Sequence, residues 1–310
     1  MKTAMNVKLR VSAAIGNTPL VELVNLNGNS RVRILGKLEG NNPGGSVKDR
    51  AAYYMIKKAE ESGALTRDRA IVEPTSGNMG IALAMLGAAL GYKVKLFMPQ
   101  CVSVERQQIL EVFGAETVLT PPKEGTDGAI RRAHQYRDEH AEECFMPNQF
   151  ANEANVLAHY ETTGPEILAQ TAGEIDVFVA GMGTTGTLMG VSRYMKEKKP
   201  EVRIIGVEPT VGHTIQGLKN MTESIVPAIY RPERLDEKIT VEDGEAFETT
   251  RLLATREGLF VGMSSGAAVV GALRIAGKMK KGTIVVLLPD RGDRYLSTTL
   301  FRSICAKCPP

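Results

Sequence analysis

The sequence predicts an α/β protein of two doubly wound domains, each a mainly parallel sheet between two layers of helices. Short β-branched runs alternate with longer, helix-like runs along most of the 310 residues. This alternation is typical of parallel strands joined by crossover helices. Many of the 31 glycines also stand at the ends of apolar runs, where a chain turns or approaches a ligand closely.

The first series of alternating elements lies between residues 69 and 147. Short apolar runs predict strands at Arg69–Pro74, Lys93–Pro99, Thr117–Thr120 and Cys144–Pro147. The longer runs between them predict helices at Gly80–Leu90, Val104–Phe113 and Gly128–Glu139. Gly91 and Gly114 directly follow two of these helices and are expected to end them.

A second series follows the first. It predicts strands at Asp176–Ala180, Arg203–Val207 and Thr283–Leu288, and helices at Thr187–Lys196, Ala246–Arg256 and Ala267–Lys278. The repetition places a boundary near Phe150. We expect a smaller, mobile domain of residues 41–150 and a larger domain of residues 1–40 with 151–310. Ligands of such sheets bind beyond the carboxyl ends of the strands, so the strand-to-helix junctions are the candidate sites.

Charge and apolar content argue against several classes of protein. The formal net charge is only +3 and the basic residues are dispersed, so nucleic acid is not expected as a partner. The most apolar run, Ile81–Leu90, is too short to span a bilayer, and Met1–Asn17 lacks a signal-peptide core. Cys305 and Cys308 alone supply too few ligands for zinc. With Cys101 and Cys144, they do not form a secreted disulfide framework. We expect a cytoplasmic protein without a metal site.

The first junction with chemical potential is the glycine-containing turn Asn41–Arg50. Ser46 could cap the helix that follows, which would place Lys48 in its first turn. The positive helix end and a dry pocket both disfavour an ammonium group, so the pKa of Lys48 should fall. A neutral amine of this kind forms Schiff bases with aldehyde cofactors. A lysine in an exposed first turn is the alternative.

The second junction is Thr75–Gly80, which directly follows the strand ending at Pro74. Its hydroxyls, its amide and the free N–H groups of a helix start could together receive a carboxylate. A simple helix cap is the alternative.

The third junction, Gly181–Thr187, matches the pattern G-x-G-x-x-G, and Glu208 follows at the spacing of a ribose-binding acid. A nicotinamide-dependent oxidoreductase is therefore one hypothesis. Against it, Thr184, Thr185 and Thr187 supply several hydroxyls, which suit a terminal phosphate better than a pyrophosphate in close backbone contact. A structural glycine turn is the remaining alternative.

The fourth junction, Gly262–Gly266, matches the G-x-S-x-G nucleophile elbow around Ser264. In hydrolases with this motif the catalytic histidine follows the serine in the chain. All four histidines precede Ser264 here. The hydrolase hypothesis therefore fails, and Ser264 must have another role.

Taken together and in order, these segments resemble the cysteine synthase family, within the fold-type II pyridoxal phosphate enzymes. Gly16–Leu20 near the start and Asp290–Ser297 near the end extend the resemblance along nearly the whole chain. The resemblance implies that Lys48 forms the Schiff base with the cofactor. It further implies that Asn78 bonds the ring hydroxyl and that Ser264 faces the pyridine nitrogen. The cofactor phosphate would be held by Gly183, Thr184, Thr185, Gly186 and Thr187.

The resemblance also implies a substrate site and a reaction. The substrate carboxylate would be bound by Thr75, Ser76, Asn78, Met79 and Gln149, with Met79 contributing only its N–H because the family usually has threonine there. The reaction is a β-replacement that makes L-cysteine from O-acetylserine or O-phosphoserine and a sulfur donor, through an α-aminoacrylate. A cystathionine β-synthase and a cysteine-consuming, sulfide-releasing enzyme are alternatives with the same residues.

The segment Gly217–Met221 resembles the B isoform of the family and its O-phosphoserine-using members, in which an arginine of this loop reads the substrate phosphate. Lys219 stands at that position here. It keeps the positive charge but lacks the bidentate fork of arginine. The family further implies a homodimer, and we expect the smaller domain to rotate toward the larger one when substrate binds.

Overall fold

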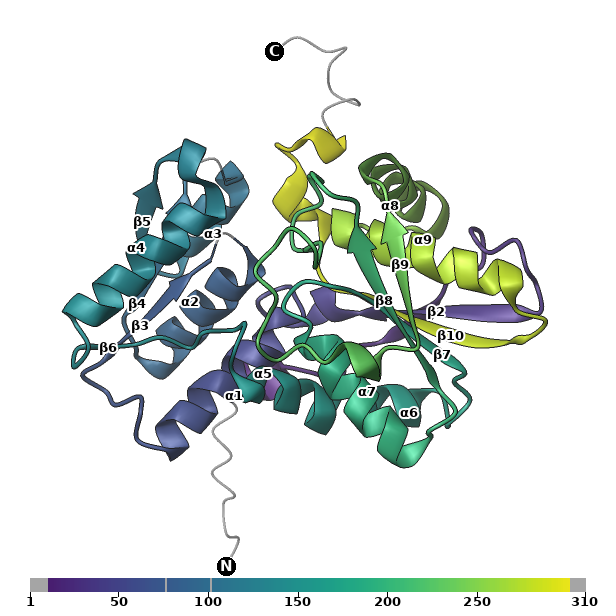
Figure 1. Cartoon of the computed structure of the whole chain (residues 1–310), viewed down its shortest axis with the longest axis horizontal. Coiled ribbons are helices and arrows are strands. Elements are labelled where there is room, and N and C mark those ends of the chain that lie inside the picture. Colours follow the sequence, from purple (N-terminus) through teal and green to yellow (C-terminus); the bar gives the residue numbers. More distant parts are fainter. Residues whose placement is uncertain (1–10, 76, 101, 302–310) are drawn as a thin grey trace, which may run out of the picture.

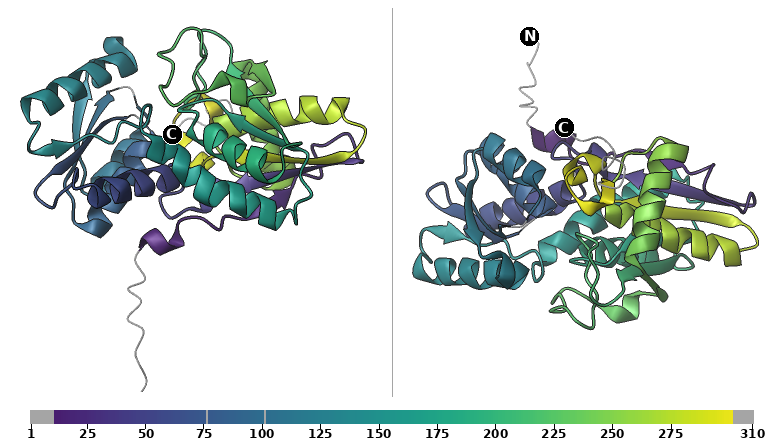
Figure 2. Two further views of the ribbon diagram at one scale, coloured as in Figure 1. Left: turned by 60° about the horizontal axis from the view of Figure 1, so that its bottom comes forward. Right: turned by 90° about the horizontal axis from the view of Figure 1, so that it is seen from above.

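The structure is a computed structural model and describes residues 11–75, 77–100 and 102–301. Four of the residues singled out above, Ser76, Cys101, Cys305 and Cys308, lie outside the described residues. Figures 1 and 2 show two lobes, one mainly blue and teal, the other purple, green and yellow. Each lobe is built around one of two sheets. None of the helices in the described ranges is long and apolar enough to cross a membrane.

The larger sheet has, within the described residues, six strands in the order β1-β2-β10-β7-β8-β9. β1 is antiparallel to β2, and the other neighbours run parallel. The strands are β1 (Leu20–Glu22), β2 (Val32–Leu38), β7 (Val177–Gly181), β8 (Arg203–Pro209), β9 (Glu237–Val241) and β10 (Gly282–Leu288).

Successive side chains of a strand point to opposite faces of the sheet. Both faces of this sheet are apolar, and helices cover each of them. Ile284 and Val286 of β10 pack in one core with α8 and α9. Val285 and Leu287 pack on the opposite face with α6 and α7. The helices are α5 (Glu153–Ala158), the π-helical turn η4 (His159–Thr163), α6 (Gly164–Gln170), α7 (Gly186–Lys198), α8 (Asp243–Glu257) and α9 (Met263–Lys278).

The smaller sheet has four parallel strands, as far as the chain is described, in the order β5-β4-β3-β6. Ile71 and Leu96 face α1 and α2, whereas Val72 and Phe97 face α4. The elements are β3 (Ala70–Pro74), β4 (Val94–Pro99), β5 (Glu116–Thr120), β6 (Cys144–Phe145), α1 (Lys48–Glu61), α2 (Asn78–Leu90), α3 (Val104–Val112) and α4 (Gly125–Glu139). Short 3₁₀ turns complete the fold: η1 (Val11–Ala14), η2 (Glu39–Asn41), η3 (Pro122–Glu124), η5 (Pro232–Arg234) and η6 (Gly292–Tyr295).

The predicted α/β class with two doubly wound units is confirmed. Gly91 ends α2 in a left-handed conformation at φ 83°, as expected. The sequence reading missed β1, β2 and β9. Arg33, Gly36 and Lys37 interrupt the apolar pattern of β2, which nevertheless pairs with β10 from the far end of the chain. The division into residues 41–150 and residues 1–40 with 151–310 stays a prediction, with which the strand membership is consistent.

Candidate active site

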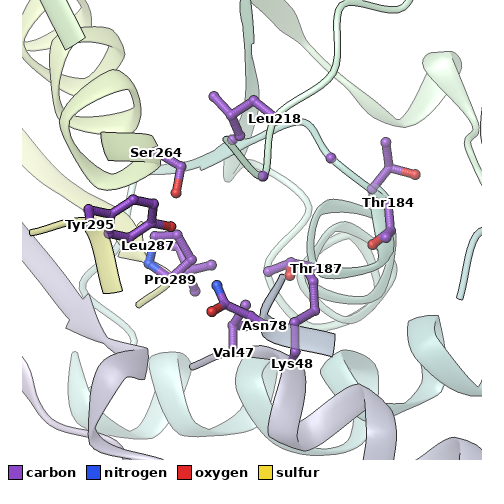
Figure 3. A pocket seen from close by; sticks show the side chains of 14 residues that line it. Val47, Lys48, Asn78, Thr184, Thr187, Leu218, Ser264, Leu287, Pro289 and Tyr295 are labelled. Atoms are coloured by element: carbon purple, nitrogen blue, oxygen red, sulfur yellow. The ribbon is translucent and has the colours of Figure 1, made fainter. Parts of the chain in front are cut away.

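In each sheet the strand order changes direction at one point. In the larger sheet, β7 has on one side β8, which follows it in the chain, and on the other side β10 from near the end of the chain. In the smaller sheet, β3 lies between β4, which follows it in the chain, and β6, the last strand of that sheet. Ligands of doubly wound sheets bind outside the carboxyl ends of the strands at such points. The segments after β7, β10 and β3 line one cavity (Figure 3). Its lining consists of Val47, Lys48, Asn78, Gly181, Gly183, Thr184, Thr185, Thr187, Gly217, Leu218, Ser264, Leu287, Pro289 and Tyr295.

Four helices begin at this cavity. Lys48 and Asn78 are the first residues of α1 and α2, and Thr187 and Ser264 lie in the first turns of α7 and α9. Helix starts present free N–H groups and a positive dipole end, which favour anions. The fold therefore directs several such starts toward a single enclosed space.

Among the described residues that line the cavity, Lys48 is the one that carries a charge. Its side chain is half-buried because it opens onto the cavity. Burial lowers the pKa of Lys48 to about 8, and the attraction of Asp290 opposes this shift only in part. An appreciable fraction of the amine is therefore neutral near pH 8, as a nucleophile or base requires.

The predicted role of Ser46 as a helix cap needs correction. The residue before α1 is Val47, whose backbone is already helical at φ −56° and ψ −22°. Ser46 Oγ nevertheless accepts a hydrogen bond from the backbone N–H of Lys48, at 3.2 Å. Ser46 thus satisfies the first N–H of the helix from one position further out.

Two residues beyond Lys48, the buried Arg50 is surrounded by carboxylates. Its Nε donates to Glu39 Oε2 at 2.7 Å, and its Nη1 donates to Glu166 Oε1 at 2.6 Å. Lys37 donates to the second oxygen of Glu166, at 2.7 Å. Burial alone would lower the pKa of Arg50, but Glu39 and Glu166 raise it above its ordinary value. This network fixes the first turn of α1, and thereby Lys48, against β2 and α6.

The turn after β7 brings the predicted phosphate-binding residues together. Gly183, Thr184, Thr185 and Thr187 line the cavity. Thr185 has a left-handed backbone at φ 67°, which is rare for a β-branched residue and often marks a functional site. Among the described residues its buried Oγ1 has no hydrogen-bond partner. Gly186 opens α7 but is not part of the lining, because it packs against Asn155.

Two buried side chains that the sequence reading missed support this turn. Asn155 Nδ2 donates to Thr184 Oγ1 at 3.2 Å. His159 Nε2 lies 3.3 Å from Thr187 Oγ1. Burial holds the pKa of His159 well below its ordinary value, so the ring is neutral. The turn is therefore held by neutral polar groups.

The predicted carboxylate loop contributes Asn78 to the cavity, while Ser76 is outside the described residues. Thr75 is buried, and its Oγ1 accepts from the N–H of Gly77 at 3.3 Å. Met79 is 1% exposed and packs in the core of the smaller sheet. Neither Thr75 nor Met79 lines the cavity, so their roles in substrate binding stay predictions.

Gln149 is buried beside this loop, and its main chain is held on both sides. Its N–H donates to Glu73 Oε1 at 3.1 Å, and its carbonyl oxygen accepts from Asn155 Nδ2 at 2.9 Å. The N–H of Asn148 donates to Glu73 Oε2 at 2.9 Å. Burial raises the pKa of Glu73 to about 7, although these two N–H groups oppose the shift. Glu73 stands within the apolar run of β3, which was the signal available in the sequence.

Ser264 lines the cavity from the start of α9, on the side opposite Thr184 (Figure 3). No histidine is among the lining residues within the described ranges. The structure thus agrees with the rejection of a hydrolase in which a histidine activates Ser264.

Lys219 follows the lining residue Leu218 but does not itself line the cavity. It is half-buried, and its Nζ lies 5.0 Å from the centre of the Phe150 ring. Burial lowers the pKa of Lys219, and Asp127 of α4 opposes that shift. Phe150 directly follows Gln149, so this cation lies beside the loop predicted to bind substrate.

Glu208, the acid that would bind the ribose of a dinucleotide, is already paired. It is buried, its Oε1 lies 2.7 Å from Lys238 Nζ, and its Oε2 accepts from the N–H of Met221 at 3.1 Å. It is not part of the cavity lining. The geometry therefore counts against the dinucleotide hypothesis.

The cavity suits a small aldehyde that carries a phosphate group. Lys48 supplies an amine that can react with a carbonyl carbon. The threonine turn supplies the unpartnered hydroxyl of Thr185 and the N–H groups of a helix start, which together match a phosphate. Ser264 can hydrogen-bond a ring nitrogen. These residues fit pyridoxal phosphate.

Comparisons with known proteins point the same way. Residues 11–290 match the model of the family described as pyridoxal-phosphate dependent enzyme. The chain is 46% identical to cysteine synthase B of Salmonella typhimurium over 93% of its own length and 94% of the relative's.

Solved structures share the fold. A cysteine synthase of Entamoeba histolytica superposes with a TM-score of 0.90 at 39% identity, covering 97% of this chain and 93% of the other. An O-acetylserine dependent cystathionine beta-synthase of Helicobacter pylori gives 0.89 at 37% identity, covering 96% and 100%.

Proposed function

The chain belongs to the family of pyridoxal-phosphate dependent enzymes, and we propose that it makes L-cysteine by β-replacement on O-acetylserine or O-phosphoserine. This proposal depends on one observation: the Lys48 amine, with its lowered pKa, and the threonine-lined turn line the same cavity. The cysteine synthases of Salmonella typhimurium and Entamoeba histolytica support the choice of reaction within the family.

The residues that would hold the cofactor lie on three sides of the cavity. Lys48 would hold it covalently, Gly183, Thr184, Thr185 and Thr187 would bind its phosphate, and Asn78 and Ser264 would contact its ring. When bound, the cofactor withdraws electrons from the substrate, which acidifies its α-proton and lets the β-substituent leave.

Lys48 Nζ would take the α-proton. With a pKa of about 8, the amine can be neutral when it accepts that proton and can hold it afterwards near physiological pH. Burial in the cavity also shields the amine from bulk water, so the proton is not lost at once to solvent.

Ser264 favours replacement over transamination. A hydroxyl opposite the ring nitrogen does not force its protonation as a carboxylate would. The ring would then be a weaker electron sink, which would disfavour transamination. The identity of this one residue thus supports a β-replacement.

The substrate carboxylate would bind at the start of α2. Asn78 and Met79 are the first residues of that helix, Thr75 lies just before it, and the main chain of Gln149 is held by Glu73. We further propose that Ser76 takes part.

Lys219 is the proposed contact for an anionic leaving group. Its half-buried amine beside Phe150 would attract the phosphate of O-phosphoserine more strongly than the neutral ester of O-acetylserine. Kinetics with both substrates, in the wild type and in Lys219→Ala, test this. If Lys219 binds the substrate phosphate, kcat/KM of the variant should fall about tenfold for O-phosphoserine. Its kcat/KM for O-acetylserine should change little. Equal changes for both would rule the contact out.

The same assay tests the function itself. The purified holoenzyme should be yellow and should release cysteine from one of the two esters when sulfide is added. The Helicobacter pylori relative makes cystathionine beta-synthase the second candidate, so homocysteine is the competing acceptor. A colourless protein that pyridoxal phosphate cannot reconstitute would refute both candidates.

Three further features belong to this proposal. We propose a homodimer, a cytoplasmic location, and a smaller domain of residues 41–150 that closes over the substrate. Gln149 and Asn78 would move with that domain, whereas the phosphate turn belongs to the larger sheet. Structures with and without bound amino acid would reveal such a closure.

A further inference from the structure

The segment after β10, residues 290–297, enters the active-site region from the larger sheet. Asp290 and Arg294 are 1% and 4% exposed, and Tyr295 lines the cavity. The proposed function gives no role to the two charged residues. Both contact Asn78 at the start of α2, across the space between the sheets.

The two contacts determine how the amide of Asn78 is oriented. Asn78 Nδ2 donates to Asp290 Oδ2 at 2.6 Å, and Arg294 Nη1 donates to Asn78 Oδ1 at 2.5 Å. A guanidinium can only donate and an ionised carboxylate can only accept. The amide therefore cannot flip without losing both hydrogen bonds. One N–H of Nδ2 remains free for a further acceptor.

Neighbouring groups hold both charged residues in place. Tyr295 Oη donates to Asp290 Oδ2 at 2.6 Å. Arg294 Nη2 donates to the carbonyl oxygen of Gly44, and the carbonyl oxygen of Arg294 accepts from Ser103 Oγ at 3.1 Å. A Cβ at position 262 would collide with Asp290 Oδ1, so Gly262 leaves room for the carboxylate.

We propose that Asp290 and Arg294 are positioning residues that orient Asn78 so that its amide offers an N–H to the ring oxygen of pyridoxal phosphate. This rests on the proposed function, because Asn78 lines the cavity in which the cofactor would bind. A donor at that point stabilises the oxygen in its anionic form. A carbonyl oxygen there would repel the anion.

A double-mutant cycle on cofactor affinity tests the proposal. Asp290→Ala, Asn78→Ala and the double variant are compared by the dissociation constant of pyridoxal phosphate and by the absorption spectrum without substrate. Asp290→Ala should weaken binding about tenfold, since one charge-assisted hydrogen bond no longer holds the amide, and should shift the absorption band. In the Asn78→Ala background the same change should cost no more than about twofold, because its effect passes through Asn78.

Two more variants serve as controls. Asp138→Asn removes an exposed carboxylate of α4 that pairs with Arg137, and should leave affinity and spectrum unchanged. Asp290→Asn keeps the side-chain shape if Asp290→Ala fails to fold, and should show a smaller loss with the same dependence on Asn78.

Two outcomes overturn the proposal. One is an unchanged affinity and spectrum in both Asp290 variants. The other is an equal loss with and without Asn78, which would mean that Asp290 acts directly, for instance on the charge of Lys48. The proposed function fails separately, if the wild type does not bind pyridoxal phosphate or makes no cysteine.

Discussion

Lys48 and Arg50 lie two residues apart at the start of α1, but their surroundings have opposite effects on the stability of the positive charge. Arg50 donates to Glu39 and Glu166, and these carboxylates raise its pKa. Lys48 faces the cavity, where burial lowers its pKa to about 8. The first arrangement fixes a charge permanently, whereas the second makes the charge easy to remove.

The comparison shows how one helical turn separates stability from reactivity. Arginine suits the paired position because it stays charged and binds carboxylates with a planar fork. Lysine suits the cavity because its charge depends readily on its surroundings. Each variant below alters one member of this pair and leaves the other in place.

The largest expected effect is on catalysis in Lys48→Ala. Without the amine no base removes the α-proton, so kcat/KM should fall on the order of a thousandfold or more, and the protein should lose its yellow colour. Steady-state assays and absorption spectra measure both. Lys57→Ala removes an exposed lysine of the same helix and serves as the control. A yellow, active Lys48→Ala enzyme would contradict the assignment.

A smaller effect, on folding rather than catalysis, is expected for Arg50→Met. Removing the guanidinium leaves the buried Glu39 without its cation and Glu166 with Lys37 as its remaining partner, which costs about 3–5 kcal/mol of unfolding free energy. Urea unfolding measures the loss. In Arg33→Met, which breaks the exposed pair with Glu22, the loss should stay below about 1 kcal/mol. Similar losses in the two variants would show that the buried network does not stabilise the fold.

The smallest effect is the pH dependence that Lys48 itself contributes in the cofactor-free protein. Below pH 8 both the folded and the unfolded state carry the proton, so the folded state bears the full cost of burying the ammonium. Between about 8 and 10.5 the folded state loses the proton first. The unfolded state then binds more protons, and stability rises with pH.

This rise should reach at most about 3 kcal/mol, because the amine is partly exposed to the cavity. The unfolding free energies of wild type and Lys48→Met, measured from pH 7 to 11, isolate the contribution. Parallel curves for the two proteins would mean that the Lys48 pKa is not lowered by folding.

Local sequence patterns were sufficient to predict all four strands described in the smaller sheet, but only three of the six described in the larger one. The elements from β3 to β6 and the series β7, β8, α7, α8, α9 and β10 fall within a few residues of their predicted bounds. β2 was missed, because Lys37 and Gly36 break its apolar pattern. Lys37 is tolerated in a buried strand because Glu166, far away in the sequence, pairs with its charge, and because Thr18 and Gln170 accept further hydrogen bonds from its amine.

Part of the candidate site could be predicted in the same way and part could not. Strand-to-helix junctions can be located in the sequence, because a short apolar run there gives way to a longer, helix-like one. These junctions contain Lys48, Asn78, the threonine turn and Ser264. Glu73, Asn155, His159, Asp290 and Arg294 were missed as supporting residues. Each acts on a partner remote in sequence, such as Asp290 on Asn78, and no local pattern records such a contact.

The sequence by itself determined the alternation of strands and helices and the identity of the reactive groups, because both depend on residue type and short spacing. The tertiary structure alone decided which charges are neutralised and which remain reactive. The pKa of a side chain depends on burial and on partners brought close by folding, as the contrast between Lys48 and Arg50 shows.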